Sequence, residues 1–484
     1  MGTKLTKGKF TDFFWTAPGL DLVRIVNNEF DKNPYFSKDN RQAVILRDIV
    51  RNELGFSDKS EQKSSPKHIE YMKKHDLVDY CDVSEKGHMK WYPKGMLIQR
   101  LLLEYARTLA HEWGAFEMKN PIIIKGGNNT VGELMGEFYE RDYRVDGGRG
   151  ECFLRYASDP LAFPFMQKVK FSANQSSLKV YEEASCFRNE QDGAVSGLKR
   201  VRNFLMTDMH AACSSEEQAK TEFEYLTKRF GQLMNDTIAK GRWVLAWEGT
   251  IDFFEQNKEW LKNLGDEINV PALYKLMPEM SHYYAIKNEF QSILQDGSNI
   301  QVSTVQWDVK DGPRFDIGYT GSDGLKHPCP VILHASSFGS IERTLCTILE
   351  NIAIDEHEGK TPSYPLWLAP TQIRIVPIND SYLTFSEQIA KYFADSHIRA
   401  DIDDRKDSVG KRIRNSAKEW VPYVLVVGEK EATSNTLQVR KRAVKEIYSY
   451  TKEELVEEIH NQTKGMPYLP LPLPQKVSIR PLFK

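Results

Sequence analysis

The sequence predicts a mixed α/β protein of the α+β kind, in which helices flank a largely antiparallel sheet and a smaller α/β domain follows. Consecutive β-rich runs with short connections occupy the middle of the chain, whereas strands and helices alternate regularly after residue 371. The 484 residues, 40% of them hydrophobic, are too many for one ordinary core. We therefore expect two or three globular units.

The first 64 residues are expected to form a small N-terminal helical extension. Residues 41–56 have apolar side chains at helical spacing, and the polar run 57–67 suits a linker.

Residues 65–362 are expected to hold the antiparallel sheet. Their clearest helix covers 95–114, and Pro121 interrupts the short strand 116–124, as at a sheet edge or an interface. Further strands are predicted over 178–187, 203–212, 300–309 and 329–334. Their short connections favour antiparallel pairing.

Residues 363–484 are expected to fold as a compact α/β domain with a proline-rich tail. Strands are predicted over 371–378, 398–403, 423–428 and 437–442, and helices over 381–397, 408–420 and 451–462. The tail at 467–476 is rich enough in proline to run extended.

Bulk composition limits the classes of protein. The net charge of -2 hides separate basic and acidic clusters, so it neither requires nor excludes a nucleic-acid partner. Six cysteines lack a CxxC pair, which is typical of a reducing compartment. No apolar run is long enough to span a membrane, and the N-terminus lacks a signal-peptide core. A cytoplasmic protein is expected.

Residues 186–210, "CFRNEQDGAVSGLKRVRNFLMTDMH", set charged and aromatic groups at strand spacing. If 202–210 is a strand, its even-numbered residues share a face: Arg202, Phe204, Met206, Asp208 and His210. Arg188 and Glu190 share a face of the preceding strand by the same rule. Guanidinium groups match phosphate oxygens and an aromatic ring stacks on a purine, so the surface suits a nucleoside triphosphate. An exposed strand with ordinary ion pairs is the alternative.

A second group of residues lies downstream, in 329–352. A strand is expected to end at His334, a serine-rich turn to cap a helix, and Arg343 to project from its first or second turn. Arg343 could then face the same phosphates, although a single helix arginine is usually a surface residue.

These stretches, taken in order, resemble a known family. "FRNE", the loop with "GLKRVRNF", and "GSIERTL" resemble motifs 2 and 3 of the class II aminoacyl-tRNA synthetases, and "KNPIII" resembles motif 1. More narrowly, "TDMHAAC", "HYYAIKNEF", "STVQWD" and "PVILHASSFGSIER" resemble the threonyl-tRNA synthetases, nearest to the archaeal form. The resemblance covers roughly residues 65–445. It implies a class II catalytic domain over 65–362 and an anticodon-binding domain over 363–484.

The resemblance implies an enzyme that activates threonine with ATP and Mg²⁺ and transfers it to the 3′ end of tRNA(Thr). By position, Arg188 would grip the α-phosphate, while Arg200 and Arg343 would hold the outer phosphates. Positioning and charge neutralisation provide most of the acceleration in such reactions. Arg188 and Arg343 would therefore be the catalytic residues.

The same resemblance implies five further contacts with the substrates. Glu190 would lie beside adenine or the acceptor end, Phe204 would stack on adenine, and Gln301 would lie near the ribose. Tyr284 and Gln306 would belong to the threonine pocket.

Threonyl enzymes differ from their relatives by one zinc ion per chain, which chelates the amine and hydroxyl of threonine and so rejects the nearly isosteric valine. His210 and His334 match the two histidine ligands, and Asp208 would accept the substrate hydroxyl. The usual third ligand is a cysteine, but the alignment places Asp159 there, and a carboxylate can bind zinc. Cys152, seven residues earlier, would point to the opposite strand face. A metal-free pocket in which the histidines only form hydrogen bonds is the alternative.

Serine raises a problem of fidelity, because it keeps both the amine and the hydroxyl. Its missing methyl is worth only about 1 to 3 kcal/mol. The family's usual remedy is an N-terminal editing domain, and the 64 residues before the catalytic region are too few for one and show no editing motif. The expectation is poor editing in cis and a separate trans-editing protein.

The C-terminal domain supplies the expected contacts to tRNA. Glu431 and Arg440 match positions that read anticodon bases in threonyl enzymes, although a plain surface role for Arg440 is the alternative. Trp420 stands where a basic residue is common, and an aromatic ring could stack on a base. Motif 1 implies a homodimer through the helix at 95–113 and the Pro121 strand.

Two rival functions stay open. A prolyl- or seryl-type ligase is disfavoured because His210 and His334 occur together with Asp208. A noncatalytic paralogue that binds tRNA tends to lose the motif arginines, whereas Arg188 and Arg343 are both present.

Overall fold

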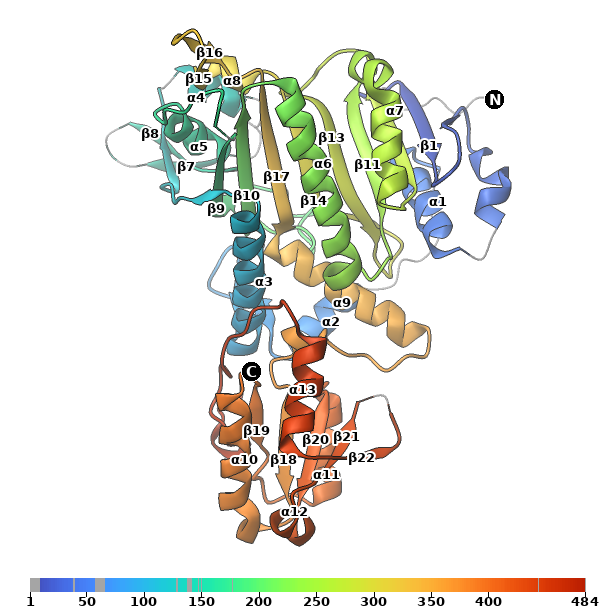
Figure 1. Ribbon diagram of the computed structural model, residues 1–484, viewed down its shortest axis with the longest axis vertical. Coiled ribbons are helices and arrows are strands. Elements are labelled where there is room, and N and C mark those ends of the chain that lie inside the picture. The colour runs from blue at the N-terminus through green and yellow to red at the C-terminus, as the bar shows by residue number, and fades with distance from the viewer. Residues whose placement is uncertain are drawn as a thin grey trace. The chain divides into compact units, whose positions relative to one another are not determined.

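The structure is a computed structural model of the chain, shown in Figure 1. It describes residues 9–37, 40–56, 66–127, 129–136, 142–146, 148, 150–175, 177–442 and 444–483. The predicted linker over 57–67 lies almost entirely outside these residues.

The chain divides into two compact units that are not continuous in sequence. Unit 1 comprises Met1–Pro66, Ser84–His88 and Ala106–Asn351, and unit 2 comprises Lys67–Val83, Met89–Tyr105 and Ile352–Lys484. The expected domain boundary lies near residue 362. In the structure, two earlier segments, Lys67–Val83 and Met89–Tyr105, also group with the C-terminal residues. Contacts between residues distant in sequence produce this grouping.

Unit 1 is built on a ten-stranded sheet in the order β2-β1-β12-β11-β13-β14-β17-β10-β9-β5. Its strands are β1 (Asp12–Thr16), β2 (Val23–Arg24), β5 (Phe116–Glu117), β9 (Leu178–Phe187), β10 (Asn203–Cys213), β11 (Val244–Thr250), β12 (Ala272–Met277), β13 (Tyr284–Ile293), β14 (Asn299–Asp308) and β17 (Val331–Ser340). Only β11 with β12 and β5 with β9 pair in parallel. The largely antiparallel sheet predicted from the sequence is confirmed.

Helices α6 (Glu216–Leu233) and α7 (Ile251–Glu267) cover one face of this sheet (Figure 1). Each begins at a hydroxyl cap, because Ser215 accepts the N–H of Gln218 and Thr250 accepts that of Phe253. Two other helices of unit 1 position site residues: α5 (Asp159–Met166) and α8 (Asp311–Arg314). Helix α9 (Ile341–His357) begins in unit 1, directly after β17.

The N-terminal residues join this sheet, so they are not the purely helical extension expected. Strand β1 pairs with β12, with Trp15 opposite Leu273. The predicted helix is present as α1 (Arg41–Glu53), and its buried Leu46 shares a core cluster with Trp15 and Val244. The sequence missed β1 because its pairing partner lies far downstream.

Strand β17 also departs from expectation. His334 lies inside this strand rather than at its end. The serine-rich residues after it continue the strand, so the prediction of a turn there is wrong. Ser336 pairs there with Asp208 of β10, so the strand continues to Ser340. A serine cap is nevertheless present, because the Ser340 Oγ accepts the N–H of Arg343 at 3.2 Å.

The predicted helix over 95–114 is present as α3 (Pro93–Glu112). Two short strands, β5 and β6 (Ile123–Lys125), replace the single strand expected over 116–124, and Pro121 lies between them. Unit 1 also has a small sheet in the order β6-β8-β7, in which β7 is Tyr143–Asp146 and β8 is Glu151–Leu154.

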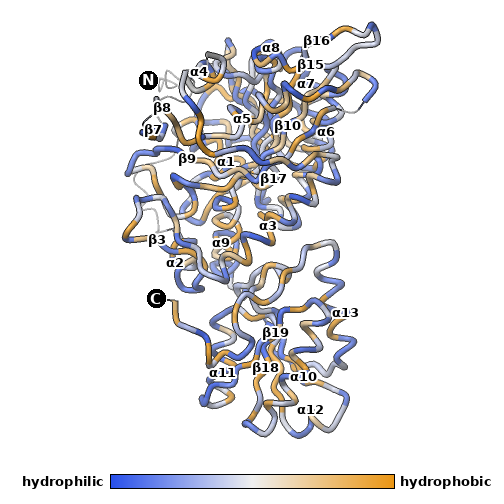
Figure 2. The backbone as a smooth tube through the Cα atoms, turned by 90° about the vertical axis from the view of Figure 1, so that its left-hand side faces the viewer, coloured by the Kyte–Doolittle hydropathy of each residue, from blue (hydrophilic) through white to orange (hydrophobic). Residues whose placement is uncertain are grey.

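Unit 2 contains a five-stranded sheet in the order β19-β18-β20-β21-β22. The strands are β18 (Ile373–Pro377), β19 (Ala400–Ile402), β20 (Tyr423–Val427), β21 (Leu437–Lys441) and β22 (Ile447–Tyr450), and the helices are α10 (Leu383–Asp395), α11 (Val409–Lys418), α12 (Glu429–Thr433) and α13 (Lys452–Gln462). The predicted alternation is confirmed, and β18 (Figure 2) is mostly hydrophobic, with Arg374 as its one charged residue. The earlier segments add α2 (Lys67–Lys74), β3 (Val78–Tyr80) and β4 (Met89–Trp91).

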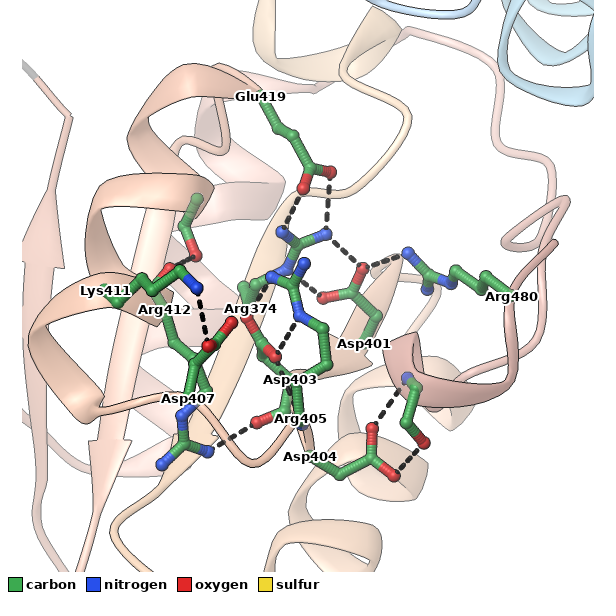
Figure 3. A network of polar contacts seen from close by, with 12 residues as sticks. Arg374, Asp401, Asp403, Asp404, Arg405, Asp407, Lys411, Arg412, Glu419 and Arg480 are labelled. Atoms are coloured by element: carbon green, nitrogen blue, oxygen red, sulfur yellow. Dashed lines mark hydrogen bonds and ion pairs between the residues drawn. The ribbon is translucent and has the colours of Figure 1, made fainter. Parts of the chain in front are cut away.

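A buried ionic network stabilises unit 2 (Figure 3). Arg374 donates to both oxygens of Asp401 at 2.8 Å and to both oxygens of Glu419 at 2.9 and 3.1 Å. Arg480 reaches the same Asp401 at 2.8 Å. Arg374 and Asp401 have no exposed side-chain surface, so each charge depends on its partners.

The proline-rich tail packs against the rest of unit 2. The Gln475 carbonyl accepts the N–H of Ile402 at 2.9 Å, and Ser478 donates its hydroxyl to Asp404 at 2.5 Å. Among the described residues, no helix has the length and apolar character needed to cross a bilayer.

Candidate functional site

A cavity of about 270 Å³ opens in unit 1 among β10, β13, β14, β17 and the start of α9. It gathers residues that the sequence analysis singled out from distant parts of the chain. The predicted ATP and threonine contacts that line it are Arg188, Glu190, Arg200, Phe204, Gln301, Arg343, Tyr284 and Gln306. Antiparallel pairing of the long strands produces this convergence.

Two of the cavity arginines, Arg188 and Arg343, are held by backbone carbonyls rather than by carboxylates. Arg188 donates its Nε–H to the Tyr156 carbonyl at 3.1 Å, and Arg343 donates its Nε–H to the Lys199 carbonyl at 3.2 Å. Enclosure, followed by the charges of Arg188 and Arg200, lowers the pKa of Arg343 to about 10. The cavity therefore carries positive charge that an anion such as a triphosphate can neutralise.

The residues expected to contact adenine have a more specific geometry. The guanidinium of Arg188 lies 5.1 Å from the centre of the Phe204 ring, so a cation covers one side of the aromatic residue expected to stack on the base. Glu190 is buried, and its carboxylate lies 4.0 Å from Arg200.

Arg202 does not join this surface. It precedes β10, and its guanidinium contacts Glu85 and Asp192, each at 2.8 Å, and the Glu190 carbonyl at 2.8 Å. These contacts tether the loop between β9 and β10. Met206, by contrast, lines the cavity as its strand position predicts.

Asp159, His210 and His334 meet beside the cavity. Asp159 is the first residue of α5, and the two histidines are paired residues on neighbouring strands β10 and β17. The Asp159 Oδ1 lies 2.8 Å from the His210 Nε2 and 3.1 Å from the His334 Nδ1. Burial alone would raise the pKa of Asp159, but hydrogen bonds and charges from both histidines hold it well below its usual value.

The three ligand atoms lie within 4.8 Å of one another, and all three residues are buried. Two imidazoles and one carboxylate are a donor set that suits zinc and leaves coordination positions open. Cys152 lies on β8, opposite Lys125 and Val145, and is not part of this cluster.

Asp208 lies on the same strand as His210, two residues away. Its carboxylate accepts a hydrogen bond from the Ser158 hydroxyl at 2.5 Å. Burial raises the pKa of Asp208, His210 opposes this effect, and Asp159 reinforces it. The carboxylate thus lies beside the cluster of Asp159, His210 and His334.

The sequence analysis missed two residues behind the cluster. Asp308 lies 2.9 Å from the His334 Nε2, and the ring of Tyr283 stacks on His334 with centres 4.8 Å apart. A signal for Asp308 was available, because it shares a strand face with Gln306, two residues earlier. Asp308, Asp311 and His334 form a second set of possible metal ligands.

A charged network that was also missed holds Tyr284. Its hydroxyl donates to Glu248 and accepts from Lys9, each at 3.0 Å. Lys287 lies 2.9 Å from Glu248 and 2.7 Å from Glu289. Lys287 and Glu289 are two residues apart on β13 and share a face of the strand, so strand spacing could have indicated that they lie together.

The expected anticodon residues lie in unit 2. Glu431, in α12, is buried and accepts the N–H of Gly428 at 3.0 Å, whereas Arg440 is exposed on β21. Trp420 is only 3% exposed and packs against the ring of His75, 3.9 Å away between centres. The burial of Trp420 therefore contradicts the expectation that its ring could stack on a tRNA base.

Comparisons with known proteins agree with the geometry. A model described as "tRNA synthetase class II core domain (G, H, P, S and T)" matches residues 165–352, and one described as "Anticodon binding domain" matches 372–462. Threonine–tRNA ligase of Methanobrevibacter smithii is 38% identical over 91% of this chain and 71% of its own length. That of Methanocaldococcus jannaschii is 35% identical over 99% of this chain and 77% of its own length.

The chain belongs to the threonyl-tRNA synthetase family. It is thus a threonine–tRNA ligase, which forms threonyl-adenylate from threonine and ATP and transfers threonine to the 3′ end of tRNA. ATP-dependent activation in class II synthetases generally involves Mg²⁺. These relatives are named as ligases, which argues against the noncatalytic alternative.

Solved structures support the fold of these synthetases. The match to "the RNA binding domain of Threonyl-tRNA synthetase" from Cryptosporidium parvum has a TM-score of 0.71 at 22% identity and covers 83% of this chain and 99% of that one. The match to the putative threonyl-tRNA synthetase ThrRS-1 from Aeropyrum pernix has a TM-score of 0.66 at 18% identity, covering 85% and 99%.

Proposed function

We propose that this ligase selects threonine with one zinc ion per chain, held by Asp159, His210 and His334. The observation that carries the proposal is the position of the Asp159 carboxylate, which reaches both imidazoles at 2.8 and 3.1 Å. These donors fit a catalytic type of zinc site, in which three protein ligands leave room for substrate. Bound zinc would coordinate the amine and hydroxyl of threonine, and valine has no hydroxyl to offer.

The chain's own residues complete the selection. Asp208 accepts the threonine hydroxyl, and Tyr284 and Gln306 line the amino-acid pocket. Gln306 accepts a hydrogen bond from Tyr283 at 3.2 Å, which fixes its amide beside the cluster. A metal-free pocket, in which the histidines only form hydrogen bonds, is the competing account.

ATP binding rests on the charge of the cavity. Arg188 holds the α-phosphate, Arg200 and Arg343 hold the outer phosphates, and Mg²⁺ accompanies them. Phe204 stacks on adenine with Glu190 beside it, and Gln301 lies near the ribose. Attack of the threonine carboxylate on the α-phosphorus then expels pyrophosphate, and Arg188 and Arg343 stabilise the charge that develops.

Further partners follow from the other surfaces. Glu431 and Arg440 read anticodon bases. The apolar side chains around motif 1 support a homodimer, because Phe116 and Ile123 are 70% and 47% exposed. Six free cysteines support a cytoplasmic location.

Editing in trans extends this proposal. The described N-terminal residues contribute to the catalytic sheet, because β1 pairs with β12 and α1 shares a buried core with it. Efficient hydrolysis of Ser-tRNA by this chain alone would contradict the need for a separate editing protein.

Substitutions of Asp159 test the zinc proposal. Wild type should contain one zinc per chain and support ATP–pyrophosphate exchange with threonine but not valine. Asp159→Ala should lose both zinc and exchange, while Asp159→Cys, which restores the family's usual ligand, should keep both. Exchange at the wild-type rate in metal-free enzyme would favour the metal-free pocket.

A further inference from the structure

A second carboxylate lies behind the proposed zinc site and faces the opposite edge of His334. The Nδ1 of this ring lies 3.1 Å from Asp159, while its Nε2 lies 2.9 Å from the Oδ2 of Asp308. Asp308 has no exposed side-chain surface. The ring is therefore held between two carboxylates, and only one of them belongs to the proposed zinc ligands.

The backbone after β14 fixes the Asp308 carboxylate. Its Oδ1 accepts the N–H of Lys310 at 2.7 Å and the N–H of Asp311 at 3.0 Å. Both donors occupy the same oxygen, so Oδ2 remains to accept one hydrogen from His334. The turn following Asp308 thus sets the direction of this carboxylate before any ligand binds.

Packing fixes the plane of the His334 ring as well. The Tyr283 ring lies nearly parallel to it, with an interplanar angle of 17° and centres 4.8 Å apart. Phe163 meets the same imidazole edge-on at 5.5 Å. The imidazole is therefore restrained in orientation by rings and in hydrogen bonding by Asp308.

We propose that Asp308 is a positioning residue that keeps the His334 proton on Nε2 and leaves Nδ1 free to bind the metal. A neutral imidazole carries one N–H, and the hydrogen bond made by one nitrogen decides which nitrogen can ligate. An Nε2–H bond to Asp308 turns the Nδ1 lone pair toward Asp159 and His210. This inference rests on the zinc site proposed above.

The proposal also decides between the two sets of possible metal ligands that share His334. Zinc bound to Nδ1 uses Asp159 and His210, whereas a metal bound to Nε2 would use Asp308 and Asp311. Arg314 lies 2.7 Å from the Asp311 carboxylate. A guanidinium already neutralises charge on that side, which disfavours a divalent cation there.

Asp308→Asn and Asp311→Asn are matched variants that test this assignment in the full-length chain. Zinc affinity is measured by competition with a chelator, and the visible spectrum of the Co²⁺-substituted protein reports the ligand field. Asp308→Asn should bind zinc about 10- to 100-fold more weakly and shift the Co²⁺ bands. Asp311→Asn should keep the wild-type affinity and spectrum.

Three outcomes would overturn the inference. Wild-type zinc affinity in Asp308→Asn would remove its positioning role while leaving the zinc site intact. Equal losses in both variants would move the metal to the Nε2 side. A wild type that binds no zinc would overturn this inference together with the zinc proposal.

A measurement on wild type covers the case in which Asp308→Asn does not fold. In zinc-loaded protein labelled with ¹⁵N-histidine, the His334 Nε2 should show the chemical shift of a protonated nitrogen, and Nδ1 that of a metal-bound one. His334→Gln assigns the resonances. A protonated Nδ1 would contradict the proposal.

Discussion

The buried Arg374 of unit 2 is paired with carboxylates, whereas the half-buried Arg188 and Arg343 of the unit 1 cavity are not. Burial alone would lower the pKa of Arg374, yet Asp401 and Glu419 raise it well above its usual value (Figure 3). In unit 1, burial and two neighbouring arginines lower the pKa of Arg343 to about 10. Among the described residues, neither Arg188 nor Arg343 forms an ion pair with a carboxylate.

The difference separates a structural cluster from a functional one. Charges that complete one another stabilise the fold, and removing one leaves its partner buried and unpaired. Charges without partners destabilise the fold unless a ligand neutralises them, so their presence in a cavity indicates a binding site. Asp159 belongs to the functional kind, because its two partners, His210 and His334, are themselves potential metal ligands.

The largest effect should come from the unpaired arginines. Arg343→Met is expected to slow threonine-dependent ATP–pyrophosphate exchange about 1,000-fold, because charge stabilisation at the phosphates is lost. The free energy of unfolding should stay the same or rise, since no carboxylate loses a partner. A destabilised variant with normal exchange would reverse the roles of the two clusters.

The paired arginine should show the opposite pattern. Arg374→Met should destabilise unit 2 by about 3 to 5 kcal/mol, visible as faster hydrogen–deuterium exchange in β18 and β20, with pyrophosphate exchange unchanged. The double variant Arg374→Met/Asp401→Leu should recover only part of this loss, because it removes the buried pair but leaves Arg480 and Glu419 without these partners. If the single variant is as stable as wild type, the network is not structural.

Glu342 extends the comparison to a buried acid of unit 1. Burial raises its pKa to about 7, although the N–H of Leu205 opposes the shift. Because the folded-state pKa exceeds the unfolded value of 4.5, the folded chain holds the extra proton between these values, and stability falls as pH rises through this window.

Glu342→Gln should remove this pH dependence. Between pH 4.5 and about 7, the unfolding free energy of wild type relative to the variant should decrease by about 3 kcal/mol as pH rises. Denaturant unfolding across this range measures the difference. Parallel pH profiles for the two proteins would show that Glu342 does not titrate as described.

The smallest effect concerns the tRNA surface of unit 2. Arg440→Gln should lower kcat/KM for aminoacylation about 10- to 100-fold, the value of a hydrogen bond to a charged group, and leave pyrophosphate exchange intact. Lys391→Gln, in an exposed pair with Asp395, is the control and should change neither. An equal loss in both would indicate nonspecific charge effects.

The sequence predicted what local rules determine. Strand spacing predicted that Phe204 and Met206 share a surface, and the resemblance supplied Asp159 as the unusual third residue of the cluster with His210 and His334. The misses depended on contacts distant in sequence. Strand β1 needs β12 to form, and Arg202 was drawn from the cavity by Glu85 and Asp192, which no strand periodicity reveals.

Other misses arose where a residue's environment, rather than its type, decides its role. Trp420 is buried against His75 instead of facing RNA. The sequence left open whether the proline-rich tail packs, and the structure holds it through Arg480, whose partner Asp401 lies in β19. Asp308 showed the strand spacing that could have identified it, but its importance depends on the distance to His334.

The central claim is that the buried groups of unit 1 bind ligands that complete their coordination and neutralise their charge. Its most direct test is zinc K-edge X-ray absorption, measured with and without threonine. The account predicts a first shell of nitrogen and oxygen from two histidines and Asp159, which gains light-atom ligands when threonine binds. A zinc–sulfur distance of about 2.3 Å, or a shell that threonine does not change, would contradict it.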